Sequence, residues 1–174
     1  MVKKPQLSNC ISNDVLLRLE QAKQKLEEEA QLAIGCVHLM LLDAEDDIVV
    51  PVGEIVHPKM IVILGYDKEA DEYIGNVFIN SKINDNIYYT EESKADHYPL
   101  YRKDYPKLIK EGHDPSYINC ATVKRYSKKR ILSEKKYLGK LKETDIKGII
   151  SVIEKSKQLT PKIKKKYGFE DKSR

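Results

Sequence analysis

The sequence predicts an α+β domain that is mainly β, a small curled antiparallel sheet or barrel that carries helices. Strand signals follow one another between Cys36 and Leu132. One well-marked helix comes after them, with Thr144 as its expected cap and Asp145 in its first turn. A second helical pattern, over residues 13–33, precedes the strands.

The first predicted element is the amphipathic helix over 13–33, preceded by a poorly ordered lead-in. Ser12 and Asn13 are candidate N-caps, and Gly35 is expected to end the helix. Its apolar positions include Leu16, Leu19 and Leu26. The stripe is narrow, so the helix needs a docking surface on the domain or on another chain, and we expect the domain.

The predicted strands are residues 36–42, 48–56, 60–65, 74–81, 116–127 and 129–132. MIVILG, at 60–65, is the clearest, and we expect 74–81 to return beside it as a hairpin. Pro51 restricts 48–56 to an edge or irregular strand. Residues 82–96 are expected to be a loop, and 97–115 irregular.

The C-terminal helix is expected over 145–158, ended by Pro161 and followed by a short basic helix that Gly168 closes. Its buried stripe is predicted to be Ile146, Ile149, Ile150 and Ile153. This organisation gives a lead-in and helix over 1–35, a barrel domain with its helix over 36–160, and a basic tail over 161–174.

The net charge of +4 is unevenly distributed along the chain. Residues 121–174 carry 18 Lys and Arg against 6 Asp and Glu, whereas residues 1–120 carry 13 against 21. A basic third on an acidic remainder indicates a polyanionic partner, with nucleic acid ahead of membrane. A solvated lysine-rich surface without such a partner is the alternative.

Several protein classes are not expected. The start of the chain lacks the apolar stretch of a signal peptide, and no run reaches the roughly 18 apolar residues of a membrane span. The three cysteines form no CxxC pattern, which favours reduced thiols in the cytoplasm. Glu54, Asp71 and Asp85 lack metal-ligand spacing, so we expect no metal ion and no other cofactor.

Polar residues flank the predicted hairpin at one end. His57 and Lys59 enter the strand MIVILG on either side of Pro58, and Asn80 and Ser81 end the next strand. Antiparallel pairing brings a strand start beside its partner's end, so these residues are expected to line one groove. An exposed sheet edge and ordinary turn chemistry explain the same residues without a function.

Four segments resemble the MazF/PemK-like ribonuclease toxins, whose fold is the CcdB/MazF-type barrel. They are MIVILG entered through Pro58, IGNVFINS, PSYINCATVKRYSKKRIL, and YLGKLKETDIKGIISVIEKSKQL. The resemblance covers roughly residues 51–159 and is one of order and pattern. It implies a small SH3-like antiparallel barrel, here with an added N-terminal helix and C-terminal helices.

The resemblance also implies an activity, which is metal-independent cleavage of single-stranded RNA by attack of the 2′-hydroxyl to give a cyclic phosphate. The family's catalytic arginine position falls on His57, and its threonine falls near Asn80 and Ser81. Lys59 is expected to neutralise developing charge. His57, Lys59, Asn80 and Ser81 are therefore the candidate catalytic residues.

The expected function is an endoribonuclease toxin of a toxin–antitoxin or phage-defence system, located in the cytoplasm. The expected partners are RNA, a protein or RNA antitoxin and a second copy of the chain, with no membrane partner. Candidate RNA-binding residues, with His97 reaching the groove from its loop, are Lys82, His97, Tyr98, Lys124 and Arg125. The alternative is a non-catalytic module on the same barrel that binds protein or nucleic acid.

Overall fold

A computed structural model of the chain describes residues 13–46, 48, 50–133 and 136–169. The chain divides into two compact units, Met1–Leu32 and Ala33–Arg174. In the first, helix α1 covers Asn13–Gln31, with Asp14 in its first turn. No residue of α1 is buried, and the predicted stripe is exposed at Leu19 (58%) and Leu26 (66%).

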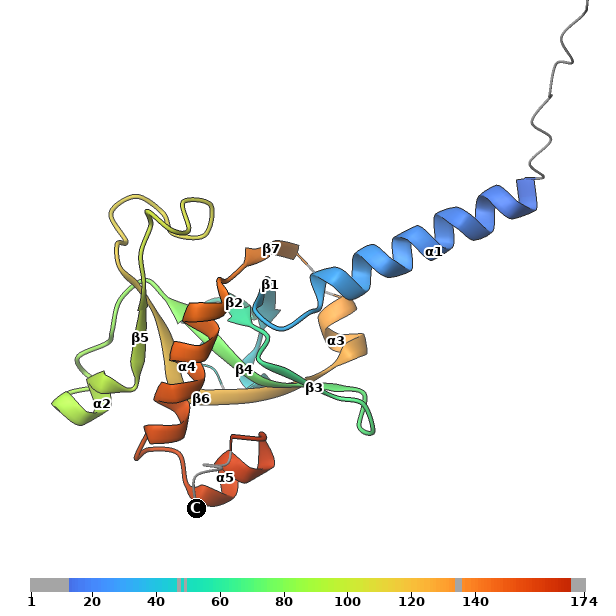
Figure 1. The fold of residues 1–174 in the computed structure, drawn as a ribbon. Coiled ribbons are helices and arrows are strands. Elements are labelled where there is room, and N and C mark those ends of the chain that lie inside the picture. Colours follow the sequence, from blue (N-terminus) through green and yellow to red (C-terminus); the bar gives the residue numbers. More distant parts are fainter. Residues whose placement is uncertain (1–12, 47, 49, 134–135, 170–174) are drawn as a thin grey trace, which may run out of the picture. The chain divides into compact units, whose positions relative to one another are not determined.

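The second unit contains an antiparallel sheet of seven strands in the order β5-β6-β4-β2-β1-β7, with β3 also paired to β4 (Figure 1). The strands are β1 Cys36–Leu42, β2 His57–Val62, β3 Gly65–Asp67, β4 Glu72–Asn80, β5 His97–Leu100, β6 Ser116–Ser127 and β7 Lys136–Lys140. This confirms the predicted α+β class. The sheet is open, because no pairing joins β5 to β7 among the described residues.

The remaining helices are η1 Ala44–Asp46, α2 Glu91–Ala95, α3 Lys128–Ser133, α4 Glu143–Lys155 and α5 Pro161–Lys166. The predicted strand at 129–132 is wrong, since α3 occupies those residues. The Ser127 hydroxyl accepts the Arg130 N–H at 3.1 Å, which gives a helix start the local cap it needs, and Ile131 is buried. The described part of 48–56 forms a turn rather than a strand, with the Glu54 N–H bonded to the Pro51 carbonyl.

Helix α4 packs on the sheet through the predicted stripe (Figure 1). Ile149 and Ile153 are fully buried, and Ile146 and Ile150 pack partly buried against the same core. The helix begins after Lys142, not at Thr144, and ends at Lys155. The predicted cap is wrong because Thr144 lies inside the helix, whose N-cap position, Lys142, makes no side-chain capping bond. The hydroxyls of Tyr98 and Tyr105 both donate to the Asp145 carboxylate in the first turn.

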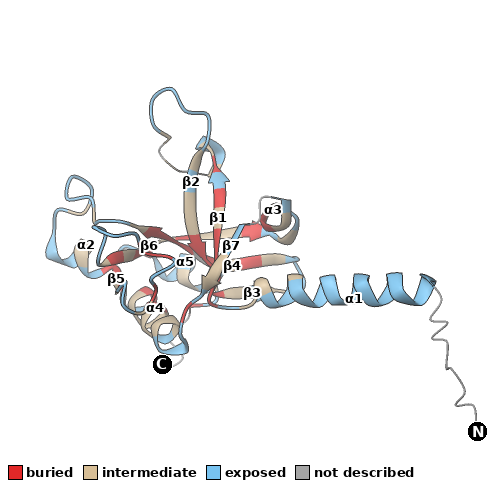
Figure 2. Cartoon of the chain, turned by 90° about the horizontal axis from the view of Figure 1, so that it is seen from above, coloured by how far each residue is buried: buried red, intermediate tan, exposed pale blue. Residues whose placement is uncertain are grey.

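A bulge in β6 bends the sheet. Val77 of β4 lies opposite Val123 of β6, but the next residue, Phe78, lies opposite Asn119. Residues 120–122 therefore have no partner on β4, and such an insertion turns the strand and increases its twist. Many of the buried residues lie along the strands of the sheet (Figure 2). This bend carries Asn119 toward the end of the sheet where β2 begins.

Candidate functional site

A cavity of about 860 Å³ lies where β2 begins and β4 ends. His57, Lys59, Asn80 and Ser81, which the sequence predicted at one groove, all line it. The strand pairing explains why. Met60 lies opposite Ile79, so the residues that precede Met60 on β2 lie beside those that follow Ile79 on β4. Ser81 directly follows β4 and is exposed, not turned into the core.

The charge of the cavity lining has one sign. Its cationic or proton-accepting members are Lys59, Lys82, Lys107, Lys110, Lys136, His57 and His113. No Asp or Glu is present among the described residues that line it. Five lysines converge without a carboxylate among them, so the cavity favours an anionic occupant.

Lys59 is the most enclosed of these cations. It lies opposite Met40 of β1, which is fully buried, so the lysine stem shares the buried face of the sheet. Burial lowers the pKa of its ammonium. No hydrogen bond or ion pair of Lys59 exists within the described part of the chain. An unneutralised, partly desolvated ammonium gains more from an anion than an exposed lysine does.

His57 shares this face, because it lies opposite the buried Leu42. Its Nδ1 is 3.2 Å from a carboxylate oxygen of Glu54, and its side chain is 31% exposed. An ionised carboxylate only accepts hydrogen bonds, so Nδ1 carries the hydrogen and Nε2 is left as the basic nitrogen. This pair is the arrangement that orients a histidine for proton transfer.

Glu54 is a site residue that the sequence reasoning missed, having considered it only as a possible metal ligand. Glu54 precedes His57 by three residues, and the tight turn that starts at Pro51 lets its carboxylate reach the imidazole. The Glu-x-x-His spacing in a turn is the signal that was available. This spacing became informative only once the turn was known, because in an extended segment the side chains of Glu54 and His57 would lie apart.

Of the five predicted RNA-binding residues, only Lys82 lines the cavity. His97 was expected on a loop, but it begins strand β5 and is buried, at 7% exposed. Its Nδ1 lies 3.2 Å from the Ser93 carbonyl oxygen, and burial lowers the pKa of the imidazole. The prediction that this ring reaches the groove is therefore wrong.

Tyr98 and Arg125 are likewise engaged elsewhere. The Tyr98 hydroxyl donates to Asp145 at 2.8 Å, and burial, with this bond, raises the pKa of the phenol to about 12. Arg125 forms ion pairs with Asp67 at 2.8 Å and Glu72 at 3.1 Å. Lys124, on β6 opposite Asn76, is partly buried and is not part of the cavity lining.

A polar network in the cavity wall was also missed. The Asn119 amide nitrogen donates to the Tyr88 hydroxyl at 2.8 Å and to the Thr122 hydroxyl at 2.9 Å. All three residues line the cavity, and Asn119 is 5% exposed. In the sequence Asn119 and Thr122 fit a regular alternating strand, so nothing indicated that a bulge would bring them together.

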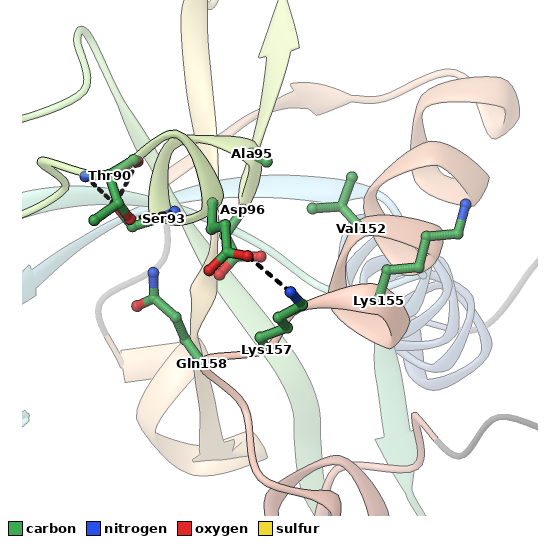
Figure 3. A pocket seen from close by; sticks show the side chains of 9 residues that line it. Thr90, Ser93, Ala95, Asp96, Val152, Lys155, Lys157 and Gln158 are labelled. Carbon is green, nitrogen blue, oxygen red and sulfur yellow. Dashed lines mark hydrogen bonds and ion pairs between the residues drawn. The ribbon is translucent and has the colours of Figure 1, made fainter.

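A smaller pocket of about 380 Å³ lies between α2 and the end of α4 (Figure 3). Lys157 there is bound to Glu92 at 2.8 Å, and the buried Asp96 accepts the Ser156 hydroxyl at 2.8 Å. Figure 3 shows Thr90 and Ser93 on one side and Val152 and Lys155 on the other. Both carboxylates of this pocket already have protein partners.

The described residues hold no group of three or more His, Cys, Asp or Glu side chains suited to a metal ion. None of the helices that the structure describes combines the length and apolarity required to cross a membrane. No protein-family model matches this chain, and no curated protein matches it either.

Proposed function

We propose that this chain is an endoribonuclease of the MazF/PemK-like toxin type, which cleaves single-stranded RNA without a metal ion. The observation that carries the proposal is a cavity whose described lining contains five lysines and no Asp or Glu, beside His57, which Glu54 orients from outside the lining. The bent antiparallel sheet with α4 packed on it supports the proposal at the level of the α+β class; relation to the SH3-like barrel of that family is part of the proposal. Action in the cytoplasm, as part of a toxin–antitoxin or phage-defence system, belongs to the same proposal.

The cavity supplies the groups that such a cleavage requires. A bond forms between the 2′-oxygen and the adjacent phosphorus, and the bond from phosphorus to the 5′-oxygen breaks. His57 Nε2 takes the proton of the 2′-hydroxyl, and an acid protonates the departing 5′-oxygen. The products are a 2′,3′-cyclic phosphate and a 5′-hydroxyl.

Lys59, Asn80 and Ser81 act on the charge that develops at phosphorus. The Lys59 ammonium neutralises the phosphorane, and its lowered pKa makes it a better proton donor toward the leaving oxygen. The amide of Asn80 and the hydroxyl of Ser81 donate to the non-bridging oxygens. Lys82 and the three other lysines of the lining bind neighbouring phosphates. They act as point charges and do not distinguish one base from another.

The exposed leucine stripe of α1 supports the proposed partners. Leu16, Leu19 and Leu26 are between 45% and 66% exposed on one helix. Apolar side chains at helical spacing are suited to a helix-binding partner, here an antitoxin or a second copy of the chain.

A non-catalytic RNA-binding module is the second candidate. It is favoured by one observation: His57 stands where the resembled family has arginine, and Asn80 and Ser81 stand where it has threonine. Such a protein binds RNA through the same lysines and leaves it intact.

Incubating the purified chain with single-stranded RNA in EDTA distinguishes the two functions. We expect cleavage, with products that end in a cyclic phosphate. The same oligonucleotide made as DNA stays intact, because it has no 2′-hydroxyl. RNA that binds but is never cut, at any protein concentration, would overturn the nuclease and leave the binding module.

A further inference from the structure

The orientation of the Asn119 amide in the cavity wall is fixed by the backbone. Its Oδ1 accepts the N–H of Ala121 at 3.1 Å. A backbone N–H can only donate, so the oxygen and nitrogen of this amide cannot be exchanged. The nitrogen side therefore faces Tyr88 and Thr122.

The Asn119 amide nitrogen then donates both of its hydrogens to hydroxyl oxygens, 2.8 Å away on Tyr88 and 2.9 Å away on Thr122. Each hydroxyl thus accepts from the amide and has its own hydrogen left to donate. Among the described residues, neither hydroxyl hydrogen has a protein acceptor. The cavity wall consequently presents two O–H donors on either side of one fixed amide.

Tyr88 is held in place as well. Its ring meets that of His97 edge-on, with the centroids 4.4 Å apart, and its backbone N–H donates to the Asn84 carbonyl at 2.8 Å. Burial lowers the pKa of His97, so the ring behind Tyr88 is neutral at physiological pH. His97 therefore supports this wall from behind instead of entering the cavity.

We propose that Tyr88, Asn119 and Thr122 form a base-reading subsite that selects an unpaired base presenting carbonyl oxygens, uracil over cytosine. Two neutral donors match carbonyl acceptors. Cytosine has a 4-amino donor where uracil has its second carbonyl oxygen, so one hydroxyl would face a donor instead of an acceptor, which is unfavourable once the bound base excludes water. Phe78 and Ile87 also line the cavity and offer the apolar contact that a base, but not a phosphate, requires.

The position of the subsite fits a base next to the reacting phosphate. Asn119 lies opposite Phe78 of β4, and Phe78 lies opposite Ile61 of β2. Two strand spacings, about 10 Å, therefore separate it from the strand that carries Lys59. That span is comparable with the distance from a phosphate to the far edge of a base on the same nucleotide.

This inference rests on the proposed function only in taking single-stranded RNA as the ligand. It is tested with probes that cannot be cleaved, 2′-O-methyl hexanucleotides of uridine and of cytidine, whose binding is measured by fluorescence anisotropy. We expect the uridine probe to bind about five- to tenfold more tightly, the effect of one or two hydrogen bonds. A wild-type protein without preference would overturn the subsite, whether or not it cleaves RNA.

Two nearly isosteric variants locate the preference. Tyr88→Phe and Thr122→Val each remove one hydroxyl, and each should lower affinity for the uridine probe while leaving the cytidine probe unchanged. Tyr89→Phe is the control, because Tyr89 is adjacent in sequence, 78% exposed and outside the cavity lining. Equal weakening of both probes would show that the hydroxyls hold a phosphate. Unchanged affinity for both probes would show that another group reads the base. Each result contradicts the inference.

Discussion

The smaller pocket and the larger cavity described above differ in how one lysine of each is neutralised. In the smaller pocket Lys157 is bound to Glu92, and this hydrogen bond raises the pKa of the ammonium and lowers that of the carboxyl. In the larger cavity burial lowers the pKa of Lys59, and no carboxylate of the described lining compensates it. The opposite shifts identify one lysine whose charge is satisfied and one whose charge is not.

This difference favours the larger cavity over the smaller pocket as the proposed anion site. An exposed ion pair such as Lys157–Glu92 contributes little to stability, and its two opposite charges leave little net charge to attract a ligand. A partly buried ammonium without a partner is unfavourable in the free protein, and an incoming phosphate removes that penalty. Proteins retain such strain chiefly at functional sites.

The largest expected effect is on catalysis. His57→Ala removes the proton carrier and should reduce the cleavage rate by on the order of 10²–10⁴. Gel assays with single-stranded RNA measure it, and circular dichroism checks that the variant is folded. Lys157→Ala in the smaller pocket is the control and should cleave at the wild-type rate. Equal cleavage rates for His57→Ala and wild type would remove the functional distinction between the larger cavity and the smaller pocket.

Glu54→Gln tests the orientation of His57. A neutral amide no longer favours the tautomer with the hydrogen on Nδ1, nor the imidazolium that forms during reaction. Because the pair is partly exposed, we expect a loss of kcat on the order of 10–100-fold, less than in a buried triad. Glu92→Gln, the matched change in the smaller pocket, should leave kcat unchanged, and a Glu54→Gln variant with the wild-type kcat would count against the pair.

Lys59→Met sharpens the comparison through salt and pH. Removing one ammonium that binds a phosphate should reduce the slope of log affinity against log salt by about 0.7 for single strands. Wild-type affinity should fall as pH rises through the lowered pKa of Lys59, since the ammonium loses its proton there, and the variant should lack this step. Lys155→Met, in the lining of the smaller pocket, should keep both features. A variant with the wild-type salt slope contradicts binding of a phosphate by Lys59.

The smallest effect belongs to the smaller pocket and concerns stability alone. Ser156→Ala leaves the buried Asp96 carboxylate without its 2.8 Å hydrogen bond. We expect the free energy of unfolding to fall by about 1–3 kcal/mol, measured by urea denaturation. RNA cleavage should be unchanged at a temperature where the variant is folded. A loss of cleavage under those conditions would mean that the smaller pocket also serves the reaction.

Much of the candidate site follows from the sequence because it lies on one hairpin. Residues in a strand alternate between two faces, and neighbouring antiparallel strands pair in a register that their apolar residues fix. His57 and Lys59 therefore had to fall on one face, beside the polar end of the next strand. The same local rules predicted β1, β6 and the isoleucine stripe of α4.

Most of the misplaced residues are held by partners that the local sequence does not indicate. His97, Tyr98 and Arg125 looked like exposed RNA ligands, yet their partners include Tyr88, Asp145 and Asp67. Two of these pairs join residues 47 and 58 positions apart. No local pattern encodes such a pairing, because it depends on where whole strands dock.

The sequence by itself determined the α+β class, the hairpin and the polar groups at its mouth, since period-two alternation and turn chemistry act over a few residues. Only the tertiary structure decided that β6 inserts between β4 and β5, and that its bulge turns Asn119 toward Tyr88, 31 residues earlier. Insertion of a strand is settled by burial of apolar surface over the whole sheet. The lysine-lined cavity and its two donor hydroxyls arise from that global packing.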